Sequence, residues 1–282
     1  MNDSHPAGTR LSVSIVLHNS SLPMLDRVLQ SLARSAEVAH AAGRVGHVLV
    51  EVLDNSCDEP FCNEARAAIA GWPQSAIFRV VYRRLADNRG FGAGHNSAIH
   101  RLDSDFHLVL NPDAELAEDA LSSGLTRLQE DPGIVLLSPR VQGPDGVQEF
   151  LCKRYPAVLL LLLRAFAPHF IRRLFQGRLD RYEMRDLCSG TAEAEIPLAS
   201  GCFMLARSAA LQSVGGFDER YFLYFEDFDL SLRLGSQGRL VFSPAMHIVH
   251  HGGYAANKGL RHIAYFVRSG TRFFRQHGWR WI

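Results

Sequence analysis

Residues 11–53 read LSVSIVLHNSSLPMLDRVLQSLARSAEVAHAAGRVGHVLVEVL and hold two apolar runs on either side of an amphipathic segment. The runs Leu11–Leu17 and His47–Leu53 are short and rich in β-branched residues, which is typical of buried strands. Between them, the apolar residues of Leu22–Ala33 recur at helical spacing. A strand, a helix and a second strand in this order predict two parallel strands joined by a helix.

The same alternation continues to about residue 130. We expect strands at Phe78–Tyr82 and Phe106–Leu110, and helices at Cys62–Ala70 and about Ala117–Gln129. This pattern predicts an α/β fold with a mostly parallel, doubly wound central sheet and helices on both faces.

The remainder of the chain is less regular. Leu159–Phe175 mixes leucines with arginines and is interrupted by a proline, and Ile196–Arg207 is expected to be a strand that leads into a short helix. Tyr221–Leu234 predicts an aromatic-rich helix with three acids, and Arg261–Trp281 a basic, aromatic helix. Because no repeat or linker separates these parts, we treat residues 1–282 as a single domain.

Composition excludes several classes of protein. With 47% hydrophobic residues and a net charge of +1, the chain is neither disordered nor an electrostatically driven nucleic-acid binder. The longest apolar run, residues 157–163, is far shorter than the roughly 18–20 residues that a spanning helix needs. The N-terminus lacks the apolar core of a secretory signal, so we expect a cytoplasmic protein. Five scattered cysteines without a CxxC pair argue against a disulfide scaffold and a zinc ribbon.

Polar loops follow the predicted parallel strands. In such sheets a ligand binds at the carboxyl ends of the strands, so we expect a site where these loops meet. They are His18–Ser21, Asp54–Ser56, Asn88–Asn96 and Asn111–Asp113.

Glycines alternate in the third of these loops, at Gly90, Gly92 and Gly94. They permit positive φ and close approach of a ligand, and the helix that follows offers N–H groups to phosphate or sugar oxygens. A plain turn is an equal alternative. The loop is not the dinucleotide fingerprint, which would follow the first strand.

Two kinds of polar group can serve a metal ion. Asp113 follows the fourth strand, where a carboxylate can hold Mg²⁺ or Mn²⁺ against a diphosphate. Taken alone, a cap of the next helix is the better interpretation of this residue. Among His247, His250 and His251, one histidine can be a second ligand, since no cysteine completes a zinc site. Ordinary core or solvated histidines are the alternative.

A third cluster of polar groups lies among aromatic residues: Glu226, Asp227 and Asp229. Burial in an apolar setting raises the pKa of a carboxyl group and makes it a better general base. The alternative is an acidic first turn that stabilises a helix N-terminus.

Taken together in chain order, these motifs resemble family-2 glycosyltransferases, and within them the bacterial rhamnosyltransferase branch. The resemblance covers about residues 11–275 and is most specific over Gly215–Arg233. The motifs are Asp54-Asn55-Ser56, the Asn88–Asn96 loop, Leu110-Asn111-Pro112-Asp113, Ser200-Gly201, Gly215-Gly216-Phe217-Asp218-Glu219, Glu226-Asp227-x-Asp229 and His250-x-Gly252-Gly253.

The resemblance implies a GT-A fold, a nucleotide-diphospho-sugar donor, Mg²⁺ or Mn²⁺, and an inverting single displacement. It further implies transfer of L-rhamnose from dTDP-rhamnose to a saccharide or lipid-linked saccharide in cell-surface polysaccharide assembly. The expected division is a donor half over residues 11–140, an acceptor and catalytic half over 141–253, and a C-terminal helix over 254–282.

By the same resemblance, Asp227 is the base, Glu226 and Asp229 support it or hold acceptor hydroxyls, and Asp54 contacts the nucleotide base. The implied donor side comprises His18, Asn19, Asp54, Asn88, Gly92, Asn96, Asn111 and Asp113. The implied metal ligands are Asp113 and His250, and the acceptor side includes Ser200 and Gly201. The first acid of the usual DxD element is replaced by Asn111, and an alternative acid pair is Asp113-Ala114-Glu115.

Charge is distributed unevenly along the chain. No acid occurs from Leu230 to Ile282, although eight basic residues do, which suggests that this end faces an anionic surface. We expect Leu159–Arg173 and the aromatic, basic tail over residues 266–281 to contact lipid headgroups. A core helix with snorkelling arginines is the alternative, and dimerisation through the tail is a third use.

Two other functions remain open at this stage. A catalytically silent nucleotide-sugar-binding subunit is suggested by Asn111. A nicotinamide-dependent oxidoreductase is suggested only by the α/β pattern.

Overall fold

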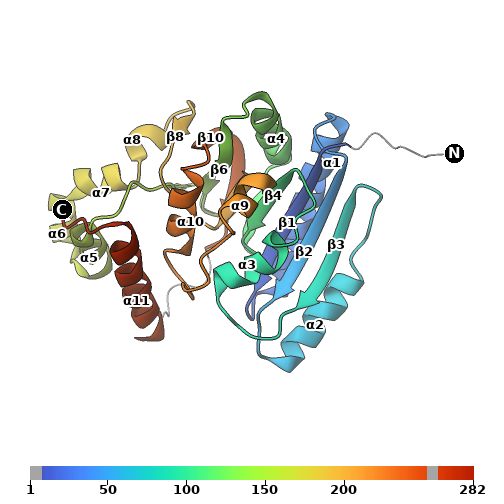
Figure 1. The fold of residues 1–282 in the computed structure, drawn as a ribbon, viewed down its shortest axis with the longest axis horizontal. Coiled ribbons are helices and arrows are strands. Elements are labelled where there is room, and N and C mark those ends of the chain that lie inside the picture. Colours follow the sequence, from blue (N-terminus) through green and yellow to red (C-terminus); the bar gives the residue numbers. More distant parts are fainter. Residues whose placement is uncertain (1–7, 253–259) are drawn as a thin grey trace.

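The computed structural model describes residues 8–252 and 260–282, which form one mixed sheet of ten strands flanked by helices (Figure 1). The strands are β1 (Arg10–Leu17), β2 (His47–Asp54), β3 (Phe78–Arg84), β4 (Phe106–Leu110), β5 (Ala114–Leu116), β6 (Ile134–Gln142), β7 (Gln148–Glu149), β8 (Ala194–Glu195), β9 (Phe203–Arg207) and β10 (Arg239–His250).

The sheet has the strand order β3-β2-β1-β4-β9-β6-β10-β5, with β7 paired to β6 and β8 to β10. Strands β1 to β4 pair in parallel, as predicted. Beyond β4 the sheet is mixed: β9 runs antiparallel to both β4 and β6, β10 runs parallel to β6, and β5 runs antiparallel to β10. The expectation of a mostly parallel sheet therefore holds only for its N-terminal half.

The helices of the first half lie close to their predicted positions. They are α1 (Leu22–Ala41), α2 (Glu59–Ala70), α3 (Phe91–Ile99) and α4 (Ala120–Glu130). Side-chain caps explain two of the starts, because Ser21 accepts a hydrogen bond from the N–H of Met24 and Asp58 from that of Phe61. Each helix then has a proline in its first turn, where the absent N–H costs no hydrogen bond.

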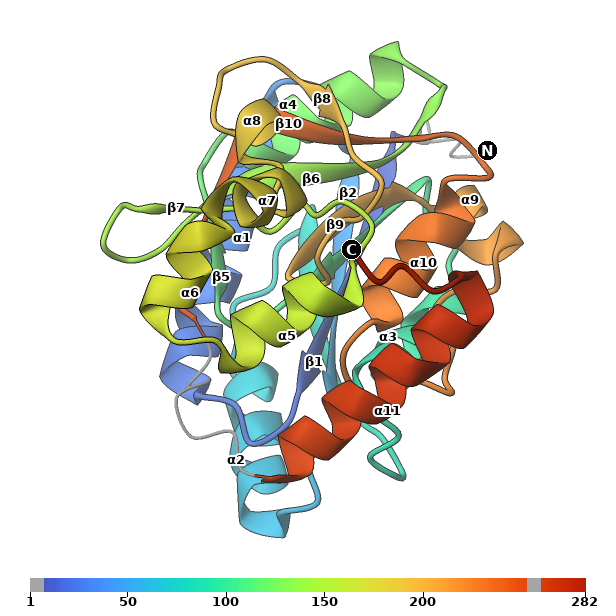
Figure 2. The same ribbon diagram turned by 90° about the vertical axis from the view of Figure 1, so that its left-hand side faces the viewer.

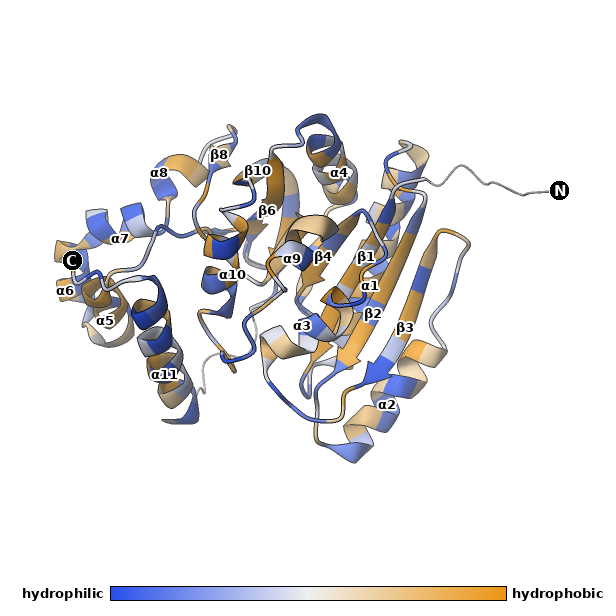
Figure 3. Ribbon diagram, viewed as in Figure 1, coloured by the Kyte–Doolittle hydropathy of each residue, from blue (hydrophilic) through white to orange (hydrophobic). Residues whose placement is uncertain are grey.

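Two layers of helices bury the sheet. Helices α1, α2 and α4 pack on one face in the largest hydrophobic cluster, and α3, α9 and α10 pack on the other. Apolar residues are concentrated on β1, β2 and β4 (Figure 3). The sheet thus holds the carboxyl ends of its parallel strands, and the loops that follow them, on a rigid support.

The second half adds helices beside the sheet: α5 (Val158–Phe166), α6 (His169–Leu174), α7 (Gln176–Tyr182), α8 (Arg185–Cys188), α9 (Ser208–Ser213), α10 (Glu226–Leu234) and α11 (Leu260–His277). Pro168 separates α5 from α6, as the interruption in the sequence indicated. Figures 1 and 2 both place α5 beside α11, at the end of the molecule opposite β3. The boundary predicted at residues 253–254, with Gly253 of the histidine motif, lies outside the described residues.

No helix in the described part of the chain is long and apolar enough to cross a membrane.

Candidate active site

Asp227 lies in the first turn of α10, on the wall of a pocket of about 390 Å³. Its side chain is fixed by two backbone donors: the N–H of Gly201 bonds Oδ2 at 3.1 Å, and the N–H of Phe228 bonds Oδ1 at 2.9 Å. Burial raises the pKa of Asp227 to about 6, against the opposing effect of these hydrogen bonds. A half-buried carboxylate with this pKa is ionised at neutral pH and close to the value that suits a general base.

Glu226 precedes Asp227 and lines the same pocket. Burial, and then the neighbouring charge of Asp227, raise the pKa of Glu226 well above its usual range. Its Oε2 is buried and has no hydrogen-bond partner within the described chain. The two carboxyl groups therefore differ in character, with Glu226 favouring its protonated form and Asp227 the anion.

The chain turns sharply just before these acids. Tyr224 and Phe225 have φ of 70° and 65°, a left-handed conformation that costs a non-glycine residue about 1–3 kcal/mol. An aromatic cluster holds the turn in place, because Phe225 packs on Phe273 and Phe274 of α11 and on Phe228. The C-terminal helix thus fixes the direction in which the acids of α10 point.

Gly201, which donates its N–H to Asp227, lies in the segment that contacts the carboxyl end of β4. A Cβ at this position would lie 2.9 Å from the Phe91 ring, so only glycine allows the approach to Asp227 without displacing that ring. The next residue, Cys202, accepts a hydrogen bond from the N–H of Asn111 at 2.9 Å. Asn111 and Asp227 consequently lie on the same edge of the sheet, although 116 positions separate them in the sequence.

Asp113 lies beside His250, because β5 and β10 pair with Ala114 opposite His250. The Oδ1 of Asp113 is buried, accepts no hydrogen bond in the described chain, and lies 3.6 Å from Nε2 of His250. The other ring nitrogen of His250 contacts Oε2 of Glu149 at 2.9 Å. Burial, followed by the charges of Asp113 and Glu149, raises the pKa of the Cys202 thiol, so these acids also lie near Cys202.

This arrangement suits a divalent cation. A carboxylate oxygen without a partner and an imidazole nitrogen face each other, and a carboxylate orients the imidazole from behind, as is common for ligating histidines. No cluster of three or more potential ligands occurs within residues 8–252 and 260–282, so the protein offers a partial coordination sphere. A diphosphate would have to complete it, which is how Mg²⁺ is commonly held.

Glu115, the alternative acid, is already paired. Its Oε1 lies 2.7 Å from Nε of Arg27 and 2.9 Å from Nε2 of His251. Asp113 has a different neighbour, since its Oδ1 lies 3.6 Å from Nε2 of His250. The pair Asp113 and His250 is therefore the better candidate for a metal than Glu115 and His251.

Three predicted donor residues meet at the carboxyl ends of β1 and β3. His18 and Asn19 are exposed after β1, and Nδ1 of His18 lies 3.3 Å from Nδ2 of Asn88. Asn88 also accepts a hydrogen bond from the N–H of Gly90 at 3.0 Å. These side chains form an accessible polar surface at the ligand-binding edge of the sheet.

Asp54, which was expected to contact the nucleotide base, is held by groups of the protein. Its side chain is fully buried; Oδ2 accepts from the Tyr82 hydroxyl at 2.6 Å and Oδ1 from the N–H of Ser56 at 2.9 Å. Ser56 in turn accepts from the N–H of Asn19. Asp54 therefore orders the loop beside His18 and Asn19, and its contact with a nucleotide base stays a prediction.

The glycine-rich segment is mostly helix, so it is not an open loop. Gly92 packs under Phe217, where a Cβ would lie 2.8 Å from the Phe217 Cβ. Asn96 is buried and clamps both the N–H and the C=O of Phe217, at 2.8 and 2.9 Å. The N–H of Phe91, which begins α3, donates to the carbonyl of Phe222 and is not free for a phosphate. In this structure Gly92 and Asn96 position the segment that leads to α10.

Asp229, expected to support the base or to hold acceptor hydroxyls, contacts α11. It is fully buried and bonds Arg233 at 2.7 Å, while Oδ1 accepts from Gln276 at 2.9 Å and from His277 at 2.8 Å. Asp229 therefore joins α10 to α11, which suits a residue that supports the position of Asp227, and a contact with an acceptor hydroxyl stays a prediction. The Oγ of Ser200 accepts from the N–H of Cys202, which stabilises the turn that presents Gly201.

Two residues of the site were not predicted. Glu149 contacts His250 from β7, and Arg164 lines the acid pocket from α5. Neither lies in a recognisable motif, and each reaches the site through tertiary packing alone.

Comparison with known proteins identifies the family of this chain. The model of "Glycosyl transferase family 2" matches residues 12–214. The N-acetylglucosaminyl-diphospho-decaprenol L-rhamnosyltransferase of Mycobacterium tuberculosis is 28% identical over 275 residues, covering 91% of this chain and 82% of that protein. Rhamnosyltransferase WbbL of Escherichia coli is 26% identical over 171 residues, covering 57% of this chain and 61% of the relative.

Solved glycosyltransferases share the fold. GalNAc-T7 with UDP, GalNAc and Mn²⁺ aligns with a TM-score of 0.60 and 16% identity over 85% of this chain. The mannosyltransferase PcManGT of Pyrobaculum calidifontis, in complex with GDP-Man and Mn²⁺, gives 0.60 and 17% over 94%. The chain spans 42% and 64% of those two proteins.

The expected GT-A fold is thereby confirmed, and an oxidoreductase is excluded by the family match. Since that match covers residues 12–214 of 282, the chain belongs to glycosyl transferase family 2 and is a glycosyltransferase of its rhamnosyltransferase-like branch.

Proposed function

We propose that this protein transfers L-rhamnose from dTDP-rhamnose to a lipid-linked saccharide, with inversion, during assembly of a cell-surface polysaccharide. The donor sugar and the kind of acceptor are taken from the relatives' names, which specify a rhamnosyltransferase acting on a diphospho-decaprenol-linked sugar. The observation that carries the reaction type is Asp227, an ionisable carboxylate held by two backbone N–H groups on the wall of a pocket.

In this proposal Asp227 takes the proton of the acceptor hydroxyl as that oxygen attacks the anomeric carbon. The new carbon–oxygen bond forms while the bond to the diphosphate breaks on the opposite face, and the nucleoside diphosphate leaves with the electron pair. A single displacement inverts the configuration. Glu226 in its protonated form donates a hydrogen bond to the acceptor without competing for its proton.

Asp113 and His250 would hold the divalent metal, with Glu149 orienting the imidazole. When bound, such an ion stabilises negative charge on the departing diphosphate. His18, Asn19 and Asn88 contribute the accessible polar surface for the nucleotide.

We place the enzyme at the cytoplasmic face of the membrane, as a peripheral protein. Most of the large hydrophobic side chains that are exposed in the described residues lie on α5, α6, α11 and the C-terminal tail. These are Leu162, Phe170, Leu174, Ile263, Val267, Trp279, Trp281 and Ile282. Apolar and aromatic groups beside a basic helix favour an anionic interface.

Two measurements on the purified protein test the proposal. Thermal shift with dTDP-rhamnose, UDP-GlcNAc and GDP-mannose, each with and without Mn²⁺, should give the largest stabilisation for dTDP-rhamnose with Mn²⁺. Incubation with dTDP-rhamnose and a diphosphate-linked N-acetylglucosamine lipid should yield a glycosylated lipid. NMR should show that the anomeric configuration of the transferred sugar is opposite to that in the donor. Donor binding without any product would instead support a catalytically silent subunit, and another preferred donor would reject rhamnose.

A further inference from the structure

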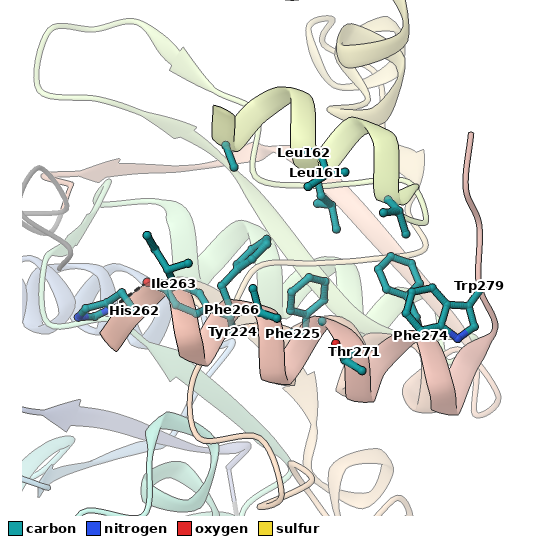
Figure 4. Close-up of a pocket in the computed structure, with 14 residues that line it drawn as sticks. Leu161, Leu162, Tyr224, Phe225, His262, Ile263, Phe266, Thr271, Phe274 and Trp279 are labelled. Carbon is teal, nitrogen blue, oxygen red and sulfur yellow. Dashed lines mark hydrogen bonds between the residues drawn. The ribbon is translucent and has the colours of Figure 1, made fainter. Parts of the chain in front are cut away.

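A groove of about 410 Å³ lies between α5 and α11 (Figure 4). Leu161 and Leu162 project into it from α5, opposite Phe266 and Phe274 of α11. Among the described residues, no Asp, Glu, Lys or Arg lines it. A binding site of this composition suits a hydrocarbon and offers almost nothing to a sugar or a nucleotide.

The groove adjoins the pocket of Glu226 and Asp227. The 390 Å³ pocket that contains Glu226 and Asp227 shares part of its wall with the groove. The shared residues are Leu161, Ala165, Tyr224, Phe225 and Phe266. The groove and the pocket of the two acids are therefore adjacent.

The charge changes where the groove meets the acid pocket. Arg164 lines the pocket but not the groove, and its side chain is 43% exposed, stacked over Tyr182 and 3.6 Å from Glu183. An anionic group attached to a hydrocarbon would meet this guanidinium on leaving the groove. The apolar groove, the positive charge of Arg164 and the carboxylate of Asp227 thus lie next to one another.

The groove is also open to the outside. Leu162, Ile263 and Val267 are 52%, 45% and 58% exposed although they line it. A contiguous apolar surface of this kind is typical of a site that a ligand or partner covers. Next to it, Arg268, Arg272 and Arg275 of α11 line a separate polar hollow, which suits an anionic membrane surface as the source of the ligand.

We propose that the α5–α11 groove binds the hydrocarbon chain of a diphosphate-linked lipid acceptor, with the diphosphate at Arg164 and the sugar at Asp227. This inference rests on the proposed function for the identity of the acceptor. It adds a chain-binding subsite, so that the lipid is recognised by the protein and is more than an anchor in the bilayer.

The first test measures binding without any sugar transfer. The probe is farnesyl diphosphate below its micelle concentration, with inorganic diphosphate as the chainless comparison, followed by calorimetry and by the fluorescence of Trp279, which lines the groove. We expect farnesyl diphosphate to bind at least tenfold more tightly than diphosphate. Equal affinity of the two would overturn the proposal.

Variants then place the chain in the groove. Leu162→Asp and Ile263→Asp each put a charge on its wall at an exposed position, which lets the protein fold. Leu174→Asp is the matched control, since Leu174 is 81% exposed on α6 and does not line the groove. We expect at least a tenfold loss of farnesyl diphosphate affinity in the first two and less than twofold in the control. An equal loss of affinity in all three variants would show that farnesyl diphosphate adsorbs non-specifically, and would contradict a binding site in the groove.

The second test uses transfer to N-acetylglucosamine diphosphate acceptors with chains of increasing length. KM should fall with each added methylene, by up to about fourfold, until the groove is full. This dependence should vanish in Leu162→Asp and persist in Leu174→Asp. If no acceptor is glycosylated, the proposed function is wrong. The binding test with farnesyl diphosphate still shows whether the groove binds a hydrocarbon chain.

A second copy of the chain is the other occupant to exclude. A dimer that Leu162→Asp dissociates in sedimentation, together with no binding of farnesyl diphosphate, would assign the groove to self-association and overturn the proposal.

Discussion

Replacing Asp227 by asparagine removes the proposed base while keeping the size of the side chain. The amide oxygen can still accept from one of the two backbone donors, Gly201 or Phe228, but the amide nitrogen then faces the other N–H. Loss of that hydrogen bond costs about 1 kcal/mol. Loss of general-base catalysis lowers the rate by about 10²–10⁴-fold, or about 3–5 kcal/mol of activation free energy. The chemical effect therefore exceeds the structural one.

The pH dependence of the wild-type enzyme follows from the same group. With its pKa raised to about 6, Asp227 is about one tenth ionised at pH 5 and about nine tenths at pH 7. We expect kcat to rise about tenfold between these values and to level off above pH 7. In Asp227→Asn this rising limb should be absent, because no carboxylate titrates at that position.

The assay is transfer from dTDP-rhamnose at saturating acceptor, with donor affinity measured separately by calorimetry. We expect kcat of Asp227→Asn to fall by at least 10²-fold while the donor Kd changes less than about twofold. Asp180→Asn, the same substitution at a partly exposed residue of α7 that does not line the acid pocket, is the control and should leave kcat unchanged. An Asp227→Asn enzyme with more than a tenth of wild-type kcat would refute the assignment.

Three further outcomes are expected. Asp113→Asn should abolish the Mn²⁺-dependent part of the thermal shift produced by donor, whereas His251→Ala should retain it. The reverse result would assign the metal site to His251 and contradict the assignment to Asp113 and His250. Asp229→Ala should lower the free energy of unfolding in urea by about 3 kcal/mol, because it breaks a buried ion pair, and a change below 1 kcal/mol would contradict that role. Burial lowers the pKa of His107 to about 3. Below pH 6.5 the unfolded chain therefore binds more protons than the folded protein, and the free energy of unfolding decreases as the pH is lowered. Between pH 7 and 5 the wild type should therefore lose more stability than His107→Asn, and equal losses would exclude this histidine as a source.

The N-terminal half of the fold could be predicted because its strands are short apolar runs separated by helices with a clear apolar face. Strands β6 and β10 were missed. Pro139 lies within β6, and β10 contains Pro244 and an irregular register between Ser243 and His247. Proline within a run normally argues against a central strand. His247 and His250 lie on β10, which pairs with β5.

The acids of the candidate site could be found from sequence, but their individual roles could not. Residue type and apolar neighbours identify Asp227 and Asp229 equally well. What separates them is tertiary: Gly201 presents an N–H to one, while Gln276 and His277, nearly 50 residues away, enclose the other. For the same reason Asp54 could not be recognised as buried, because its partner Tyr82 comes from another strand.

The central claim is that Asp113, His250 and Asp227 act on one donor molecule from the same edge of the sheet. A crystal structure of Asp227→Asn with dTDP-rhamnose and Mn²⁺ tests it most directly, because the slow variant preserves the intact donor. The account predicts anomalous density for Mn²⁺ between Asp113, His250 and the diphosphate, with the anomeric carbon turned towards residue 227. Density that places the diphosphate away from Asp113, or the sugar outside the pocket of residue 227, would contradict it.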